Sequence, residues 1–421
     1  MNRGYDKMEK IRFGVIGLGG RGHGIMCGNI FTIKDVEVTA VCDAYADRAE
    51  RSADAVEEKY GKRPLCTTDY KELLHSGLVD IVYIATAWET HLEIAIEAMR
   101  SGVVAGFEVG GSYSIDECWE LVKTYEQTGV PCMLLENCCY DNRELIVTNM
   151  VRAGVFGTVV HCAGAYAHDL RGEISQGNID RHYRLRNYLN RNCENYPTHE
   201  LGPIAKILNI NRGNKFLSLV SVASKACGLE EYIKDTKLYE KDPTLKDAKF
   251  AQGDIVTTII TCANGETITL RLDTTLPRGY NREFTVRGTR AGYDMISNNV
   301  YEGGPNGGHA VDKCIDSYID KYQPDVWYNI TEEEKEAGHG GMDGIILREF
   351  VKAYKEGRPM PIDAYDAAAW MCISCLSERS IAEGGAVQQI PDFTNGKWLI
   401  RKPEDVIPLS VREEQDFKSN N

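Results

Sequence analysis

Three glycines near the start of the chain have a spacing that suits dinucleotide binding. Gly17, Gly19 and Gly22 follow the apolar run 11–16 in the order GxGxxG. The first glycine permits a tight turn from strand to helix, the second lets backbone amides approach a pyrophosphate, and the third lets the helix pack closely on the strand. Unpaired amides and the helix dipole at a helix N-terminus favour the negative charge of the pyrophosphate. Gly20 and Arg21 complete the predicted cofactor loop.

An acidic residue about 20 positions beyond these glycines indicates which dinucleotide binds. The apolar segment 36–42 resembles a second strand, and Asp43 follows it directly. A carboxylate at this point accepts hydrogen bonds from the ribose hydroxyls and repels a 2′-phosphate, so the pattern favours NAD over NADP. Arg48 leaves NADP open as an alternative, and a plain glycine turn next to a surface aspartate is the other interpretation.

A second set of residues, farther along the chain, could transfer protons. Tyr196 and His199 stand at the start of a predicted helix, in which Pro197 suits the first turn. The helix dipole there disfavours a protonated His199 and favours a tyrosinate at Tyr196. Glu136 and His168 each lie at the end of a predicted strand, where polar and titratable groups gather. Capping or packing is the alternative role for a tyrosine and a histidine at a helix start.

The elements that must position these residues alternate between strands and helices in the N-terminal part. Helix-like segments at 46–59, 70–74, 90–100 and 115–128 alternate with apolar segments at 79–85, 103–108 and 130–136. This alternation predicts a parallel sheet that is covered on both faces. Ligands bind such sheets outside the carboxyl ends of the strands. We therefore expect one crevice bordered by Trp88, His91, Glu108, Glu136 and Asn137.

The C-terminal part has a different pattern. Strand-like runs at 159–166, 216–223, 255–262, 267–272 and 283–288 suggest a mostly antiparallel sheet with one free face, and the segment 171–196 suggests a long functional loop. A last helical region is expected at 364–383. We predict an α/β protein with an N-terminal Rossmann dinucleotide-binding domain at 1–137. A substrate-binding α+β domain, built on the mostly antiparallel open sheet, is predicted at 138–421.

Charge and composition narrow the class of partner. The 421 residues carry a formal net charge of -14, which disfavours binding to nucleic acid or to an anionic membrane and favours a small molecule. We expect a cytoplasmic protein, because no apolar segment precedes the first strand and no later run could span a bilayer. Fourteen cysteines then fit free thiols better than disulfides. The pair Cys372 and Cys375 lacks a second pair and lies in a predicted helix, so no metal site is expected.

The N-terminal motifs resemble one enzyme family. The glycine fingerprint, Ala85-Thr86 followed by His91, and the strand that ends at Glu108 are similar to the Gfo/Idh/MocA oxidoreductases. In that family a nucleotide domain is followed by a sheet-bearing substrate domain. Most of its dehydrogenases have Glu-Lys-Pro where this chain reads Glu108-Val109-Gly110, so the resemblance does not extend to alcohol dehydrogenation assisted by that lysine.

A narrower resemblance covers nearly the whole chain. It is to glycoside hydrolase family 109, known for NAD-dependent alpha-N-acetylgalactosaminidases, and it rests on Ile115-Asp-Glu-Cys-Trp119, Met133-Leu-Leu-Glu-Asn-Cys-Cys-Tyr140, His168-Asp-Leu-Arg171, Tyr196-Pro-Thr-His199, Asn209-Ile-Asn-Arg-Gly213, His339-Gly-Gly-Met-Asp343 and Ile390-Pro-Asp-Phe-Thr394. The resemblance implies a glycoside substrate, NAD as cofactor, and site residues at Glu136, Tyr166, His168, Arg184, Tyr196, His199 and Tyr280. Glu200 departs from the small residue usual in the family, and the segment 171–196 is short, so the sugar or aglycone can differ.

The resemblance also implies a mechanism. Transient oxidation at sugar carbon 3 acidifies the proton on carbon 2, a base removes it, the aglycone is eliminated, water adds to carbon 1, and the hydride returns. Tyr196 with His199 is the first choice for the proton-transfer pair. His168 and Glu136 are candidates for orienting hydroxyls or assisting departure of the aglycone, and Tyr166, Arg184 and Tyr280 are expected to bind substrate. An NAD-dependent sugar or glycoside 3-dehydrogenase, an enzyme paired with a separate lyase, and a sugar or nucleotide sensor are the alternatives. The free sheet face suggests a homo-oligomer.

Overall fold

The structure, a computed structural model, describes residues 10–303, 310–336 and 338–412. The chain forms two compact units: unit 1 comprises Met1–Glu108, Glu120–Leu135 and Thr331–Ala364, and unit 2 comprises Val109–Trp119, Glu136–Ile330 and Tyr365–Asn421. The boundary expected after residue 137 lies close to Leu135. Both units are nevertheless discontinuous in sequence, because the segment 109–119 belongs to unit 2 and the segment 331–364 belongs to unit 1. The first nine residues, for which the sequence predicts no export segment, lie outside the described residues.

Unit 1 contains the predicted parallel sheet. Its strands are β1 (Ile11–Ile16), β2 (Val36–Cys42), β3 (Leu65–Thr67), β4 (Ile81–Ile84), β5 (Val104–Phe107) and β6 (Cys132–Leu134). They form a six-stranded sheet in the order β3-β2-β1-β4-β5-β6, and every pair is parallel. The residues of β4 and β5 are buried throughout, as expected for strands covered on both faces. The strand order reverses between β1 and β4, which is where sheets of this kind bind ligands.

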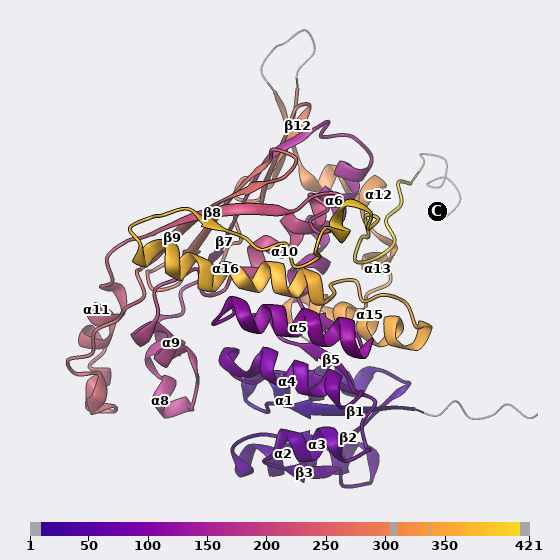
Figure 1. The fold of residues 1–421 in the computed structure, drawn as a ribbon, viewed down its shortest axis with the longest axis vertical. Coiled ribbons are helices and arrows are strands. Elements are labelled where there is room, and N and C mark those ends of the chain that lie inside the picture. Colours follow the sequence, from indigo (N-terminus) through magenta and orange to yellow (C-terminus); the bar gives the residue numbers. More distant parts are fainter. Residues whose placement is uncertain (1–9, 304–309, 337, 413–421) are drawn as a thin grey trace, which may run out of the picture. The chain divides into compact units, whose positions relative to one another are not determined.

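The helices of unit 1 follow the strands as the alternation predicted (Figure 1). They are α1 (Gly20–Gly28), α2 (Ala46–Tyr60), α3 (Tyr70–His75), α4 (Trp88–Arg100), α14 (Glu332–Glu336) and α15 (Met342–Glu356), while α5 (Ile115–Thr128) divides between the units. Sequence reasoning did not predict α15. This helix packs on the sheet, and a Cβ atom built on Gly106 would lie 2.9 Å from Phe350 Cε1. Gly106 therefore leaves room for the Phe350 ring.

Unit 2 contains a nine-stranded sheet that is mostly antiparallel, as predicted. The strands are β7 (Val159–Ala167), β8 (Phe216–Ala223), β9 (Ile255–Cys262), β10 (Thr267–Asp273), β11 (Thr285–Gly288), β12 (Ala291–Asp294), β13 (Asn299–Glu302), β14 (Val311–Cys314) and β15 (Gln388–Gln389). Their order is β14-β13-β12-β11-β7-β10-β9-β8-β15, and β7 with β10 is a parallel pair. The strands β12, β13 and β14 were not predicted, because each is only four residues long and lacks a clear alternation.

One prediction for unit 2 was wrong. The segment 171–196 is not a long loop, because it contains α7 (Arg171–Ser175), α8 (Gly177–Asp180) and α9 (Arg184–Asn190). Isolated buried residues, Ile174, Leu185 and Tyr188, anchor these short helices in a segment that is otherwise rich in Arg and Asn. Such sparse apolar positions give no helical periodicity that a sequence pattern could reveal.

The other helices of unit 2 are α6 (Asn142–Arg152), α10 (Thr198–Ile207), α11 (Gly228–Asp235), α12 (Ile319–Tyr322), α13 (Asp325–Tyr328) and α16 (Ala364–Ala382). Helix α10 packs against β7, where a Cβ atom on Gly164 would lie 2.8 Å from Glu200 Cβ. The sheet also has exposed apolar side chains: Val160, Val222 and Ile259 are 49%, 56% and 50% exposed.

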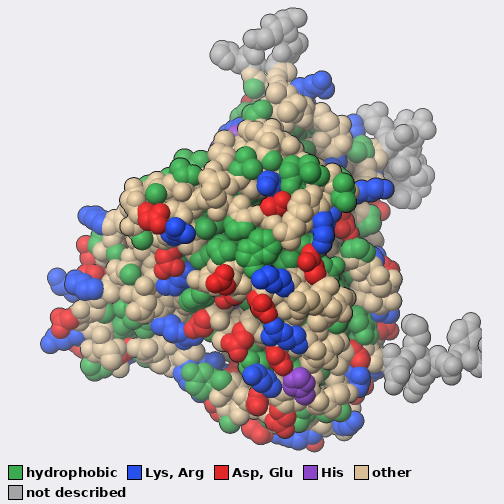
Figure 2. Space-filling view, viewed as in Figure 1, with side chains coloured by type: hydrophobic (Ala, Val, Ile, Leu, Met, Phe, Trp, Pro, Cys, Tyr) green, Lys and Arg blue, Asp and Glu red, His purple; other side chains and the backbone are tan. Residues whose placement is uncertain are grey.

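Charged side chains of both signs are mixed on the surface. Figure 2 shows Lys and Arg side chains interspersed with Asp and Glu on the face in view, rather than gathered into a region of one sign. Within the described residues, no helix combines the length and the apolar character needed to cross a membrane. All fourteen cysteines are free thiols, and those of Cys372 and Cys375 donate to backbone carbonyls within α16.

Candidate active site

The glycine turn of unit 1 has the geometry that its spacing predicts. Gly17 has φ +90°, and a Cβ atom there would lie 2.5 Å from the Ala85 backbone. A Cβ atom on Gly22 would lie 1.8 Å from the Gly17 carbonyl oxygen. By contrast, a Cβ atom on Gly20 would meet nothing within 4 Å, and one on Gly19 would meet only Arg48 Nη1 at 3.6 Å. The turn is therefore closed on its inner side and open where a dinucleotide would approach.

Asp43 is fixed beside this turn. Its Oδ2 accepts a hydrogen bond from the Leu18 N–H at 2.6 Å and its Oδ1 accepts one from the Tyr45 N–H at 2.9 Å. A carboxylate has about four acceptor sites, so sites remain for ribose hydroxyls. The Arg48 guanidinium lies 4.9 Å from the centre of the Tyr45 ring. The turn, the uncapped N-terminus of α1 and Asp43 together fit a dinucleotide.

The Arg21 side chain forms ion pairs with carboxylates of unit 1. Its two terminal nitrogens donate to Asp343 Oδ2 at 2.6 Å and Oδ1 at 2.9 Å, and its Nε donates to Glu108 Oε1 at 3.0 Å. The Tyr83 hydroxyl also donates to Glu108, at 2.6 Å. Burial by itself would raise the pKa of Asp343, but hydrogen bonds from Arg21 and His339 hold this pKa well below its usual range. Arg21 thus fastens the glycine turn to α15.

Sequence reasoning gave Asp343 no role, although it ends the motif His339-Gly-Gly-Met-Asp343. We expect Asp343→Asn to lower the free energy of unfolding by about 1.5–3 kcal/mol, because it removes the charge from a buried, bidentate pair. Denaturant unfolding at neutral pH measures this difference. Asp54→Asn is the matched control, since Asp54 is exposed and its pair with Arg63 lies on the surface. Equal stabilities of the two variants would contradict a stabilising role for Asp343.

Two further predicted cofactor residues lie in α4. Trp88 is its first residue and is 3% exposed. His91 is 1% exposed, and its Nε2 lies 3.0 Å from the Thr86 carbonyl oxygen. Burial lowers the pKa of His91, so its ring is neutral near neutral pH. The contact with the Thr86 carbonyl oxygen stabilises the Ala85-Thr86 segment, against which Gly17 packs. Asn137 belongs to unit 2, next to Glu136, and the crevice expected to include both units stays a prediction.

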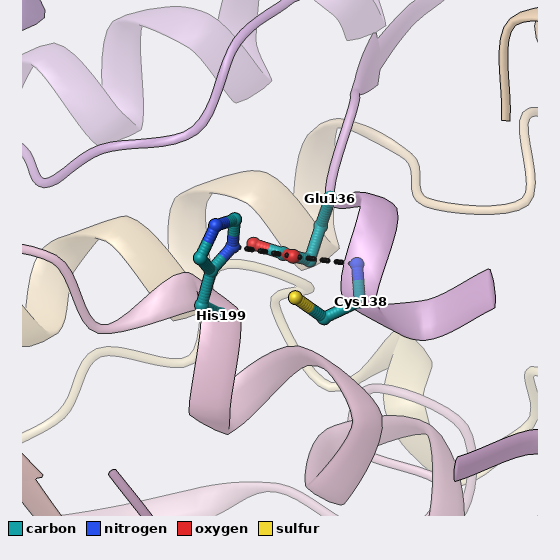
Figure 3. A group of neighbouring side chains, drawn as sticks. All are labelled: Glu136, Cys138 and His199. Carbon is teal, nitrogen blue, oxygen red and sulfur yellow. Dashed lines mark hydrogen bonds and ion pairs between the residues drawn. The ribbon is translucent and has the colours of Figure 1, made fainter. Parts of the chain in front are cut away.

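A buried histidine and glutamate form the centre of the candidate site in unit 2 (Figure 3). Glu136 Oε1 lies 2.8 Å from His199 Nδ1 and accepts a second hydrogen bond from the Cys138 N–H at 3.0 Å. Burial alone would raise the pKa of Glu136, but His199 and these hydrogen bonds hold it below its usual value. When an ionised Glu136 accepts a hydrogen bond from Nδ1–H, Nε2 is the ring nitrogen of His199 that is left to accept a proton.

Aromatic and basic side chains surround this pair. The Tyr166 and Tyr196 rings are 4.4 Å apart between centroids, and the Tyr196 and His199 rings are 4.8 Å apart. The Arg184 guanidinium lies 5.0 Å from the Tyr196 ring centre, and the His168 and Tyr280 rings are 5.1 Å apart. The structure therefore brings together all the substrate and catalytic residues that the sequence predicts: Glu136, Tyr166, His168, Arg184, Tyr196, His199 and Tyr280.

The electrostatic state of two of these residues follows from their surroundings. Burial raises the pKa of Tyr166 to about 12, against the opposing effect of Arg184, so its hydroxyl stays protonated near neutral pH. Burial and Arg184 lower the pKa of His168, so its imidazole is neutral there. The Tyr166 hydroxyl and His168 Nδ1 are 3.5 Å apart. The site thus offers neutral hydrogen-bonding groups next to the Glu136–His199 pair.

Sequence reasoning missed one residue that supports the site. Arg282 is 6% exposed, and its guanidinium donates to Glu144 Oε1 at 2.6 Å and lies 3.1 Å from Asp141 Oδ2. It also donates to the Tyr280 hydroxyl at 3.1 Å. Arg282 therefore holds the Tyr280 hydroxyl in place while its ion pairs with Glu144 and Asp141 fix the guanidinium. Its place two residues after Tyr280 was the only signal in the sequence.

Three potential metal ligands also meet in this site. One ligand atom each from Glu136, Cys138 and His199 lies within 4.8 Å of the others, as Figure 3 illustrates. The hydrogen bonds of Glu136 already account for this spacing. Burial raises the pKa of the Cys138 thiol well above its usual value, which disfavours the thiolate that a metal requires.

Comparisons of sequence assign the two parts of the chain to families. Residues 140–400 match the family described as the C-terminal domain of glycosyl hydrolase 109, and residues 11–135 match the oxidoreductase family with an NAD-binding Rossmann fold. An alpha-N-acetylgalactosaminidase of Tannerella forsythia is 39% identical over 416 residues, covering 93% of this chain and 88% of that protein. A glycosyl hydrolase family 109 protein of Solibacter usitatus is 39% identical over 402 residues, covering 93% and 90%.

Solved structures support the fold. Levoglucosan dehydrogenase, in a complex with NADH, has a TM-score of 0.66 at 16% identity, covering 91% of this chain and 99% of that chain. Myo-inositol 2-dehydrogenase from Lactobacillus plantarum has a TM-score of 0.63 at 15% identity, covering 91% and 100%. At these identities the likeness concerns the fold, and it agrees with the predicted Rossmann and open-sheet architecture.

Proposed function

This chain belongs to glycosyl hydrolase family 109, and from that premise we propose that it is an NAD-dependent glycosidase that hydrolyses alpha-N-acetylgalactosaminides. The observation that supports this most is the buried Glu136–His199 pair, at 2.8 Å, with the Tyr166 and Tyr196 rings against it. A base oriented by a carboxylate, next to hydroxyl donors, is what proton abstraction beside a sugar carbonyl requires. Val109 in place of the family's lysine argues against an ordinary alcohol dehydrogenase.

The side chains of the site have distinct proposed roles. Bound NAD supplies reversible oxidation at sugar carbon 3, which acidifies the proton on carbon 2. His199 Nε2 accepts that proton, and Glu136 stabilises the resulting imidazolium. The hydroxyls of Tyr166 and Tyr196 and the guanidinium of Arg184 donate hydrogen bonds to the negative oxygen that develops on the sugar. His168, neutral and half-buried, orients a hydroxyl or assists departure of the aglycone, and Tyr280, whose ring lies 5.1 Å from that of His168, contacts the substrate beside it.

The cofactor site is proposed to select NAD over NADP. Asp43 is held by two backbone amides beside the glycine turn, where its charge would repel a 2′-phosphate. The pyrophosphate is proposed to lie at the N-terminus of α1, over Gly19 and Gly20. Trp88, His91 and Asn137 are the further proposed contacts. We also propose a homo-oligomer that covers the exposed apolar side chains of the sheet in unit 2.

The proposed function has a direct test. Purified protein is incubated with an aryl alpha-N-acetylgalactosaminide in deuterated water, with NAD and in parallel with NADP. Aryl release, NADH absorbance and deuterium at sugar carbon 2 are followed together. We expect aryl release with deuterium uptake, no net NADH, and faster turnover with NAD. Accumulating NADH with an intact glycoside would indicate a dehydrogenase, and aryl release without deuterium uptake would exclude carbon 2 deprotonation.

A further inference from the structure

Two buried glutamates lie side by side next to the catalytic histidine. Glu194 is 0% exposed and Glu200 is 2% exposed, and their carboxyl groups lie within hydrogen-bonding reach of each other. None of their four carboxyl oxygens has a side-chain donor as a partner among the described residues. The charged group that faces Glu200 from another element is Glu136, which adds negative charge, while the Tyr196 N–H faces Glu194.

Two ionised carboxylates cannot form a hydrogen bond with each other, because both are acceptors only. Burying both charges without a cation would be costly, and a single proton between them removes one charge and supplies a donor. Burial raises the pKa of both carboxyls, and the negative charge of Glu194 raises that of Glu200 further, whereas the hydrogen bond from Glu200 lowers the pKa of Glu194 relative to that of its partner. The geometry and the electrostatics therefore favour a carboxylic acid bonded to a carboxylate.

Glu194 and Glu200 stand at the two ends of the segment 194–200, which contains the proposed proton-transfer residues Tyr196 and His199. At one end, the Glu194 N–H donates to Ser377 Oγ at 2.8 Å and the Glu194 carbonyl accepts from Ser374 Oγ at 2.6 Å, both on α16. At the other end, Glu200 lies in the first turn of α10 and packs against Gly164 of β7. Tyr196 and His199 lie between these two anchored glutamates in sequence.

We propose that Glu194 and Glu200 share one proton and act as a positioning pair for Tyr196 and His199. With the proton present, the carboxyl hydrogen bond closes the segment 194–200. Without it, repulsion between two carboxylates loosens the segment and displaces the base. The shared proton itself does not depend on the proposed function, whereas its effect on catalysis does.

Stability against pH tests the shared proton without any substrate. A carboxyl whose pKa is raised in the folded state keeps its proton after the unfolded chain has lost it. Its stabilising contribution is complete below the ordinary glutamate pKa, near 4.3, and is lost as the pH rises through the raised pKa of the folded pair. Over that window the unfolding equilibrium constant of the wild type should rise, relative to that of Glu200→Gln, by about tenfold per pH unit, as one proton requires.

Glu194→Gln should behave like Glu200→Gln, because an amide keeps a hydrogen bond without titrating. The matched control is Glu58→Gln, a change of the same chemistry at an exposed position of α2, which should keep the wild-type dependence on pH. A ratio between wild type and Glu200→Gln that does not vary with pH would overturn the proposal. So would stabilisation of the wild type by added calcium at pH 8 that both Gln variants lose, since a cation would then replace the proton.

Infrared spectroscopy and the pH dependence of activity test the proposal in two further ways, and neither requires that a variant be as stable as the wild type. Infrared spectra of the wild-type protein at pH 6 should contain the carbonyl stretch of a buried protonated carboxylic acid, and this band should weaken as the pH is raised into the alkaline range. Absence of that band at pH 6 would contradict the shared proton. In the glycosidase assay, kcat/KM of the wild type should fall at alkaline pH as the pair loses its proton, and Glu200→Gln should lose this alkaline limb. A limb unchanged in both Gln variants would overturn the positioning role while leaving the proposed function intact.

Discussion

Replacement of His199 by Gln should lower kcat for aglycone release by about 10²- to 10⁴-fold, the contribution typical of a positioned general base. The amide has a similar reach but cannot accept a proton near neutral pH. Because the His199 ring is held by Glu136 at 2.8 Å, the loss should be in kcat more than in KM. Initial rates with the aryl glycoside at saturating NAD measure this effect, and deuterium exchange at sugar carbon 2 should fall in parallel.

Controls separate chemistry from folding in this experiment. His161→Gln makes the same change on β7 of the same sheet, where His161 bonds to Thr267, and it should retain wild-type rates. Glu136→Gln should also reduce kcat, since an amide cannot stabilise a charged imidazole. NAD binding should be unchanged in the variants, because the glycine turn and Asp43 belong to unit 1. If His199→Gln keeps its rate within about threefold, a value far below the range for a general base, the base is another residue.

Much of the architecture follows from short-range patterns. The helix Ile115–Thr128 and the strands Phe216–Ala223 and Ile255–Cys262 have the predicted bounds, because an apolar period of one element type continues through each of them. The placement of Tyr196 and His199 could likewise be predicted from the motif Tyr196-Pro-Thr-His199, because the proline indicates where the helix begins. Local signals of this kind need no knowledge of the tertiary fold.

The contacts that sequence reasoning missed are long-range. Arg21 and Asp343 are 322 positions apart, and nothing in either local sequence indicates that α15 returns to the parallel sheet. Glu194 and Glu200 are close to each other in sequence, but the contacts that bury them are also long-range, because they come from α16 and β7. Arg21 was predicted as a cofactor residue from its place in the glycine loop. In the structure its guanidinium instead donates hydrogen bonds to Asp343 and Glu108, and these contacts depend on the tertiary fold.

Substitution of Gly22 by Ala should have the largest effect on the cofactor site. The added Cβ would lie 1.8 Å from the Gly17 carbonyl oxygen, and a backbone atom cannot move aside as a flexible side chain can. The helix α1 must then shift away from the turn that is proposed to hold the pyrophosphate. Overpacking of this kind costs about 1–3 kcal/mol, so NAD affinity should fall about 5- to 150-fold, as measured by calorimetric titration.

Gly24→Ala is the matched control for this substitution because it adds the same methyl group to the same helix. A Cβ atom on Gly24 meets nothing within 4 Å, and alanine is favoured over glycine in a helix by about 0.5–1 kcal/mol. We therefore expect Gly24→Ala to keep the wild-type NAD affinity and to unfold at the same or a higher denaturant concentration. Equal NAD affinities for the two variants would mean that close packing at Gly22 does not shape the dinucleotide site. A loss confined to Gly22→Ala would instead support the glycine turn as the place where the pyrophosphate binds.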